Sequence, residues 1–351
     1  MEGFVEVQAF IDEYLRSGAP APPPFESLTT DQLKTLAQEA CDWKHWESAL
    51  GYLMELHERG YEPGRTCANI GQIVAELGRP DEAIAWYRQS LNLVPENQHL
   101  HDALIFTMEC EPSTTVSESL MERARYFKQF GEAAYQKRIL PRNAPDPDRP
   151  LHIGYVSGDW NFHSASMAFA GVIAGHRKDF IAHAYCTLPL EHQDDVSSQW
   201  RELLGDRFVQ VDGLTPGQLA AVIRHDEIDI LVDLSGYSSR HRLQTFAYRP
   251  APIQVQAWGF VVGTGSPVID VIFADPVVAP PEVQAGLVER VYHLPCLLGY
   301  TPKTTFEDVS PLPCLENPPT FGVFQRAVKI NDETLRVWRR VLEAVPDSQI
   351  M

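Results

Sequence analysis

Residues 151–163 (LHIGYVSGDWNFH) join an apolar run to groups that can do chemistry. The apolar residues of 152–156 are typical of a buried strand, the chain breaks at the Ser-Gly-Asp of 157–159, and His163 follows. In an open parallel sheet, chemistry gathers where strands end. A histidine placed there can exchange a proton near neutral pH. We therefore treat His163 as a candidate site residue, with a capped loop and a surface histidine as the alternative.

Charge and cysteine spacing argue against several classes of partner. The 351 residues carry a formal net charge of −18, which disfavours nonspecific binding to nucleic acid or anionic membrane. No apolar run reaches the roughly 20 residues of a membrane helix, and the N-terminus does not resemble a signal peptide. The six cysteines lie far apart without a C-x-x-C pair. These features predict a cytoplasmic protein with reduced thiols, no metal, no membrane and no nucleic-acid partner.

The first part of the chain has a helical pattern. A short helix is expected over 1–18 and a proline-rich connector over 19–25, followed by helices from about 28 to 137. Within 64–95, the offsets of Gly71, Ala83 and Pro95 fit a tetratricopeptide repeat. A weaker copy precedes it. A third, degenerate pair of helices is expected over 98–137, with the second helix starting near 114–117. Repeats of this kind bind peptides or proteins on a concave face; a plain helical bundle is the alternative.

From residue 151 the pattern becomes strand, loop and helix, which predicts a doubly wound α/β domain. The run IDILVDLSG is uniformly apolar until its Asp and Ser-Gly, as expected of a parallel strand buried on both faces. Strands are expected at 152–156, 181–186, 208–211, 229–233, 253–258, 271–274 and 291–294, and helices at 167–174, 196–204 and 215–224.

Proline-rich boundaries divide the chain. We predict an N-terminal helix and connector (1–27), helical repeats (28–137), a linker (138–150), an α/β domain (151–318) and the start of a further unit (319–351). That last unit is expected to hold a strand at 320–324, a helix at 331–344 and the start of a strand at 348–350. One β-α unit is too small to close a core. We therefore expect either that the chain is C-terminally truncated or that these elements pack on the preceding sheet.

With these segments in place, residues 150–351 resemble glycosyltransferase family 41, the protein O-linked N-acetylglucosamine transferases and their SPINDLY-type relatives. The resemblance is carried, in order, by GYVSGDWNFH (154–163), IRHDEIDILVDLSGYSSRHR (223–242), FAYRPAPIQVQAWGF (246–260), DVIFADPVVAPPE (270–282) and TFGVFQRAVKINDETLRVWRRVLEAVPDSQI (320–350). The family also carries N-terminal tetratricopeptide repeats.

The resemblance implies a GT-B fold, with two Rossmann-like lobes and a nucleotide-sugar between them. It implies inverting, metal-independent transfer of a sugar from a UDP-sugar, the donor substrate, to Ser or Thr of a protein or peptide held by the repeats. No cofactor is expected. By the same resemblance, His163 and His225 are catalytic, and Lys329 neutralises the leaving diphosphate. A helix C-cap is the alternative role for His225, and a solvated surface lysine is the alternative for Lys329.

The chain departs from the family pattern at several points. Gly259 begins a glycine-rich loop that lines the family's site, but the loop reads GFVVGTG (259–265), with bulky Val261 and Val262. Ser164 replaces a proline after the first histidine. Arg326 stands where a glutamine is expected beside uracil and diphosphate. Residues that hold diphosphate and ribose in the family's second lobe have no counterpart here, so the donor site is expected to be incomplete.

Three questions stay open at this point. The chain is either an O-glycosyltransferase portion or a non-catalytic relative that binds proteins through its repeats, and within the enzyme reading the donor sugar is GlcNAc, glucose or fucose. Arg240 and Arg242 either face the crevice or pair with surface carboxylates.

Overall fold

The computed structural model describes residues 25–351, except 147, 261, 300–307, 309 and 327–328. The helix predicted over 1–18 and nearly all of the proline-rich connector lie outside this range. The described chain divides into two compact units, one of 25–97 with 324–335 and the other of 98–323 with 336–351. The domain limits given above stay a prediction.

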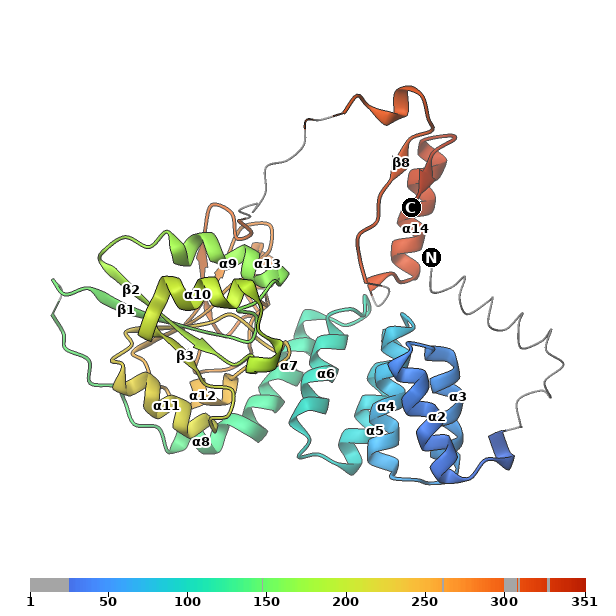
Figure 1. Ribbon diagram of the computed structural model, residues 1–351, viewed down its shortest axis with the longest axis horizontal. Helices are drawn as coiled ribbons and strands as arrows, with labels where there is room; N and C mark the ends of the chain where they lie inside the picture. The colour runs from blue at the N-terminus through green and yellow to red at the C-terminus, as the bar shows by residue number, and fades with distance from the viewer. Residues whose placement is uncertain (1–24, 147, 261, 300–307, 309, 327–328) are drawn as a thin grey trace. The chain divides into compact units, whose positions relative to one another are not determined.

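The first unit contains a short 3-10 turn, η1 (Phe25–Ser27), and two helical hairpins (Figure 1). The first hairpin is α2 (Thr30–Asp42) and α3 (Trp46–Glu58), and the second is α4 (Pro63–Glu76) and α5 (Pro80–Leu93). Thr29 caps α2 through a reciprocal pair of bonds with Gln32. A Cβ at Gly71 would lie 2.7 Å from the Tyr87 ring, so only glycine lets α4 approach α5 this closely. This is the packing expected of a tetratricopeptide repeat.

The second unit begins with α6 (Gln98–Met108), α7 (Val116–Tyr126), a π-helical turn η2 (Phe127–Gly131) and α8 (Glu132–Gln136). Thr115 caps α7 in a capping box with Glu118, at the start expected from the sequence. The π-helical turn was not anticipated.

A seven-stranded parallel sheet follows, in the order β3-β2-β1-β4-β5-β6-β7. The strands are β1 (Leu151–Ser157), β2 (Phe180–Cys186), β3 (Phe208–Gln210), β4 (Ile230–Asp233), β5 (Ile253–Gln256), β6 (Val271–Ala274) and β7 (Arg290–His293). All seven were expected within a few residues. The connections are α9 (Ser164–Ala174), α10 (Asp195–Leu204), α11 (Pro216–His225), α12 (Leu243–Ala247) and α13 (Pro281–Gln284), with short 3-10 turns η3 (Leu190–His192) and η4 (Gly205–Arg207). The short helices α12 and α13 were missed.

Helices cover both faces of the sheet (Figure 1). On one face, Tyr155 packs with Phe169 of α9 and Trp200 of α10. On the other, Leu231 packs with Ile223 of α11. The alternation of side chains along each strand supplies both cores, and the doubly wound fold expected from the sequence is observed.

The strand order reverses between β1 and β4, because β2 and β3 extend to one side and β5 to β7 to the other. In sheets of this kind, ligands bind outside the carboxyl ends of the strands at this switch point. The loops that follow β1 and β4 are therefore the place to look for a site.

The residues after the sheet form η5 (Pro313–Leu315), β8 (Thr320–Phe321), α14 (Asp332–Ala344) and β9 (Gln349–Ile350), with β8 and β9 paired in parallel. The strand, helix and strand expected here are present, and α14 buries none of its residues. No helix of the described residues is long and apolar enough to cross a membrane.

Candidate functional site

The loop after β1 is anchored so that it delivers His163 to the carboxyl edge of the sheet. Ser157 Oγ accepts the N–H of Asp159 at 3.0 Å. Trp160 is fully buried, with its ring 5.2 Å from that of Phe169. The N–H of Phe162 donates to the Asp194 carboxylate at 2.7 Å. A loop fixed at its start, middle and end holds the backbone of His163 in one place.

His163 serves as the N-cap of α9. Its Nδ1 accepts the N–H of Ala165 at 3.2 Å and lies 3.6 Å from Oδ1 of Asp159. The histidine side chain is half exposed, whereas that of Asp159 is 19% exposed. Burial raises the pKa of the Asp159 carboxyl, and the charges of His163 and Arg240 oppose that rise. His163 thus presents a half-exposed imidazole at the carboxyl edge of the sheet, with a carboxylate beside it.

Arg240, in the loop after β4, lies against the loop after β1. Its carbonyl accepts the hydroxyl of Thr187 at 2.9 Å, and its φ of 63° is left-handed. A Cβ at Gly158 would lie 3.0 Å from the Arg240 Cβ, so glycine at 158 makes room for this approach. Arg240 is exposed, and its charge acts on Asp159. Arg242 instead donates to the carbonyls of Val211, Asp212 and Leu214, so it holds a loop rather than pairing with a surface carboxylate.

Asp233, the last residue of β4, shapes the turn that leads to Arg240. Its carboxylate accepts the N–H groups of Ser235 at 3.2 Å and Gly236 at 2.8 Å. Burial raises its pKa to about 6, against the opposing effect of these two bonds and of His241. The turn after β4 therefore depends on a carboxylate that is costly to ionise.

Gly259 lies directly against the end of β4. A Cβ built there would lie 1.5 Å from the carbonyl oxygen of Leu234, which no side chain can accommodate. The structure therefore explains glycine at 259 by the close approach of two backbones. Its expected role in donor binding stays a prediction.

Helix α7 clamps the rest of the glycine-rich loop. Buried Arg123 donates to the carbonyl of Gly263 and to Glu109, and its guanidinium lies 5.4 Å from the Phe260 ring centroid. Val262 is half-buried against Phe260 and its neighbours, so this valine fills an apolar contact. Val261 lies outside the described residues.

On the opposite side of the same loop, the N–H of Thr264 donates to Glu289 at 2.5 Å, and the Tyr237 hydroxyl donates to the carbonyl of Thr264 at 2.7 Å. The loop is thus fixed from α7, from the loop after β4 and from Glu289, which directly precedes β7.

The structure does not bring His225 to His163. His225 is the last residue of α11 and is exposed, a few residues before β4 begins. It therefore lies at the amino edge of the sheet, whereas His163 follows the carboxyl end of β1. The helix-end position expected as the alternative for His225 is the one observed, with Asp226 as the C-cap residue.

Arg326 and Lys329 lie in the segment between β8 and α14, and both are exposed. The N–H of Lys329 donates to the carbonyl of Arg326 at 3.0 Å, and its own carbonyl accepts the Thr334 hydroxyl. This segment groups with residues 25–97, not with the sheet. The donor-binding roles of the two residues stay predictions.

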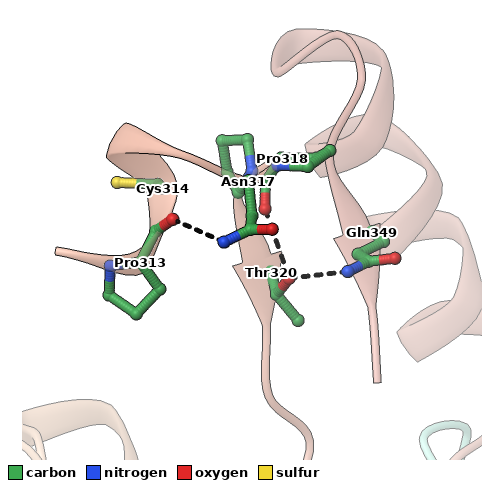
Figure 2. Close-up of a pocket in the computed structure, with 7 residues that line it drawn as sticks. Pro313, Cys314, Asn317, Pro318, Thr320 and Gln349 are labelled. Atoms are coloured by element: carbon green, nitrogen blue, oxygen red, sulfur yellow. Dashed lines mark hydrogen bonds between the residues drawn. The ribbon is translucent and has the colours of Figure 1, made fainter.

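A hollow of about 540 Å³ lies beside β8 and β9 (Figure 2). Its polar groups bond to one another: Gln349 Nε2 donates to Thr320 at 2.8 Å, and Asn317 Nδ2 donates to the carbonyl of Pro313 at 3.2 Å. Its lining holds no Lys, Arg, His, Asp or Glu. Without a cation it is a poor match for a diphosphate, and we do not regard it as the site.

The residues that the sequence analysis missed are the partners of His163. Asp159 was visible as the acidic residue four positions before the histidine. The clamp by Arg123 had no local signal, because it joins residues 140 positions apart.

Comparisons with known proteins show which family the chain resembles. The model of glycosyl transferase family 41 matches residues 124–306. The probable UDP-N-acetylglucosamine–peptide N-acetylglucosaminyltransferase SPINDLY of Arabidopsis thaliana is 35% identical over 215 residues, which cover 60% of this chain and 23% of the relative. The similarly named SEC protein of the same plant is 30% identical over 224 residues, covering 60% and 22%.

A solved structure of a mutant O-GlcNAc transferase from Thermobaculum terrenum matches with a TM-score of 0.78 and 27% identity, over 92% of this chain and 61% of that one. The matches therefore span about a quarter of the curated relatives and less than two thirds of the solved one. The family model covers more than half of this chain, including the loops that follow β1 and β4, and the chain belongs to glycosyl transferase family 41.

Proposed function

We propose that this chain supplies the helical region and first lobe of an inverting protein O-glycosyltransferase, which moves a sugar from a UDP-sugar to Ser or Thr without a metal. The observation that carries the proposal is the position of His163. It lies at the switch point of the sheet, half exposed and beside Asp159 and Arg240, within the segment matched by the family model.

In this proposal the acceptor hydroxyl attacks the anomeric carbon on the face opposite the leaving UDP, and one displacement inverts the configuration. The hydroxyl must lose its proton as the new C–O bond forms. His163 is the residue at the crevice edge suited to receive it, because a histidine changes charge near neutral pH. His225 is left out, because it lies at the other edge of the sheet.

The departing UDP gathers negative charge, which a fixed cation stabilises. We assign this role to Lys329, with Arg326 beside the nucleotide and the Gly259 loop lining the pocket. The bonds from Arg123 and Glu289 support a role of this loop in binding. They hold the loop in one conformation before the donor binds, so less conformational entropy is lost on binding.

The acceptor is proposed to be a protein or peptide, presented through the helical hairpins α2 to α5. A cytoplasmic location is also part of the proposal. It is supported by the six cysteines, all of which are free thiols.

Sugar transfer tests the proposal. The chain, extended by a complete second lobe, is incubated with radiolabelled UDP-GlcNAc, UDP-glucose or GDP-fucose and a set of peptides rich in Ser and Thr. We expect transfer from a UDP-sugar, lost by roughly a hundredfold or more in His163→Ala and retained in the matched control His225→Ala. No transfer from any donor, or equal loss in both variants, contradicts the proposal.

A second candidate is a non-catalytic protein-binding role through the hairpins, which pack closely on one another and belong to a compact unit of their own. It predicts no binding of UDP in calorimetry. Micromolar UDP affinity, abolished by Lys329→Ala, would decide for the enzyme.

A further inference from the structure

His163 is held in a state that cannot act as a base through its outer nitrogen. Its Nδ1 accepts the N–H of Ala165 at 3.2 Å as the N-cap of α9. A neutral imidazole that accepts at Nδ1 carries its proton on Nε2. In this state Nε2 is a hydrogen-bond donor and has no free lone pair for the proton of an acceptor hydroxyl.

Asp159 provides the alternative partner for the same nitrogen. Its Oδ1 lies 3.6 Å from Nδ1, just beyond hydrogen-bond length. The carboxylate is mostly buried, so it has few competing water contacts. A small rotation of the ring or of the carboxylate turns this approach into an Nδ1–H···Oδ1 bond. With the proton on Nδ1, the lone pair of Nε2 is free.

Burial raises the pKa of Asp159 overall, but two neighbouring charges, those of His163 and Arg240, act in favour of its ionised form. The Arg240 guanidinium lies near enough to lower the pKa of the carboxyl against the effect of its burial. The Thr187 hydroxyl donates to the carbonyl of Arg240 and holds its backbone in place. Glycine at 158 leaves room for the Arg240 side chain. The groups on both loops thus form one charge-balanced cluster.

We propose that Asp159 is a positioning residue that draws the proton of His163 to Nδ1, so that Nε2 becomes the base for the acceptor hydroxyl. This inference rests on the proposed function. As the hydroxyl oxygen bonds to the anomeric carbon, its proton passes to Nε2, the bond from that carbon to the diphosphate breaks, and UDP leaves with the electron pair. The imidazolium keeps its Nδ1–H bond to Asp159 and later releases the Nε2 proton to water.

The tautomer of His163 can be read without any activity. The chain is labelled with ¹⁵N-histidine, and the two ring nitrogens are assigned by their loss in His163→Gln. We expect wild type to show a mixture of Nδ1–H and Nε2–H forms. Asp159→Asn should show Nε2–H alone, because the asparagine amide donates to Nδ1. Identical ring shifts in the two proteins would overturn the proposal.

Kinetics provide the second arm. We expect Asp159→Asn to lower kcat about a hundredfold with KM for the UDP-sugar unchanged, and Asp159→Glu to restore part of kcat. Asp179→Asn makes the same chemical change at the amino edge and should leave kcat and KM unchanged.

If wild type transfers sugar and Asp159→Asn matches it, the inference fails while the function stands. If wild type transfers nothing, the function fails and the ring shifts still decide the tautomer. Should Asp159→Asn not fold, Asp159→Ala, which also removes the carboxylate, is compared in its place, and ring shifts equal to those of wild type contradict the inference.

Discussion

The two edges of the parallel sheet use aspartate in opposite ways. At the amino edge, Asp229 precedes β4 and Asp270 precedes β6, and each pairs with an arginine, Arg149 and Arg249. At the carboxyl edge, Asp233 accepts backbone N–H groups of the turn that follows β4, and Asp275 does the same after β6. The first arrangement neutralises charge; the second shapes loops.

Asp229 and Asp233, at the two ends of β4, show this difference. Burial alone would raise the pKa of Asp229, but bonds from Arg149, the His152 N–H and Asn143 outweigh it and lower the pKa. At the other end of β4, burial dominates and raises the pKa of Asp233 to about 6. The partners of Asp229 therefore favour its charged form, whereas the charge of Asp233 at the other end of β4 responds to pH near neutrality.

Breaking the close approach at Gly259 should have the largest effect. Gly259→Ala places a Cβ within 1.5 Å of the Leu234 carbonyl oxygen, so the loop must move. We expect a loss of about 4 kcal/mol in the free energy of unfolding, measured by urea denaturation with tryptophan fluorescence. Gly213→Ala, where a Cβ meets nothing within 4 Å, is the control and should change stability by less than about 1 kcal/mol. Equal effects would mean that the loop is not pressed against β4.

Removing the Asp229 carboxylate at the amino edge should have the second-largest effect on stability. Asp229→Ala leaves Arg149 and Asn143 without their carboxylate partner at a largely buried position. We expect a loss of about 3 kcal/mol, measured in the same way. Asp179→Ala removes an exposed ion pair with Arg177 and should cost under about 1 kcal/mol. A small effect at Asp229 would contradict the view that this edge is closed by charge pairing.

The pH dependence of stability should have opposite signs at the two ends of β4. An unfolded aspartate has a pKa near 3.9. The folded pKa of Asp233 is raised to about 6, so its contribution is fully present below about pH 4 and is lost as pH rises through 6. The difference amounts to about 2–3 kcal/mol. Asp233→Asn should remove this loss between pH 4 and 7.

For Asp229 the folded pKa is lowered, so its contribution is present above about pH 4. It is lost as pH falls further. Asp229→Asn should therefore change the stability curve only on the acid side, in urea titrations at fixed pH. Curves in which both variants alter the same pH range would contradict the contrast between the two edges.

Sequence reasoning reached the strands and the first crevice loop but not the pairing of distant groups. Apolar runs identify parallel strands because both faces are buried, which located all seven strands of the sheet. His163 was identifiable because it follows one of them. His225 was placed by resemblance alone, and the topology puts it at the other edge, since α11 runs back against the strands.

The missed contacts share a physical cause. Arg123 reaches Gly263 from a helix that local pattern assigns only to the repeats. The linker predicted over 138–150 is bonded to Asp229 through Asn143 and Arg149, which no local composition signals. Such bonds depend on which loops meet in space, and that is decided by strand order rather than by any one segment.

The smallest expected effect separates the two roles of His163. His163→Ala removes the N-cap of α9 and should cost about 1 kcal/mol of stability, whereas His163→Asn keeps a good capping side chain and should cost almost nothing. Both should lose sugar transfer alike, because asparagine cannot take up a proton. Urea denaturation of the two variants measures the capping role of His163, and the transfer assay on the same proteins measures its role in catalysis. If His163→Asn kept transfer, the histidine would matter at this edge only as a cap, and the crevice would resemble the amino edge in chemistry as well as in residue type.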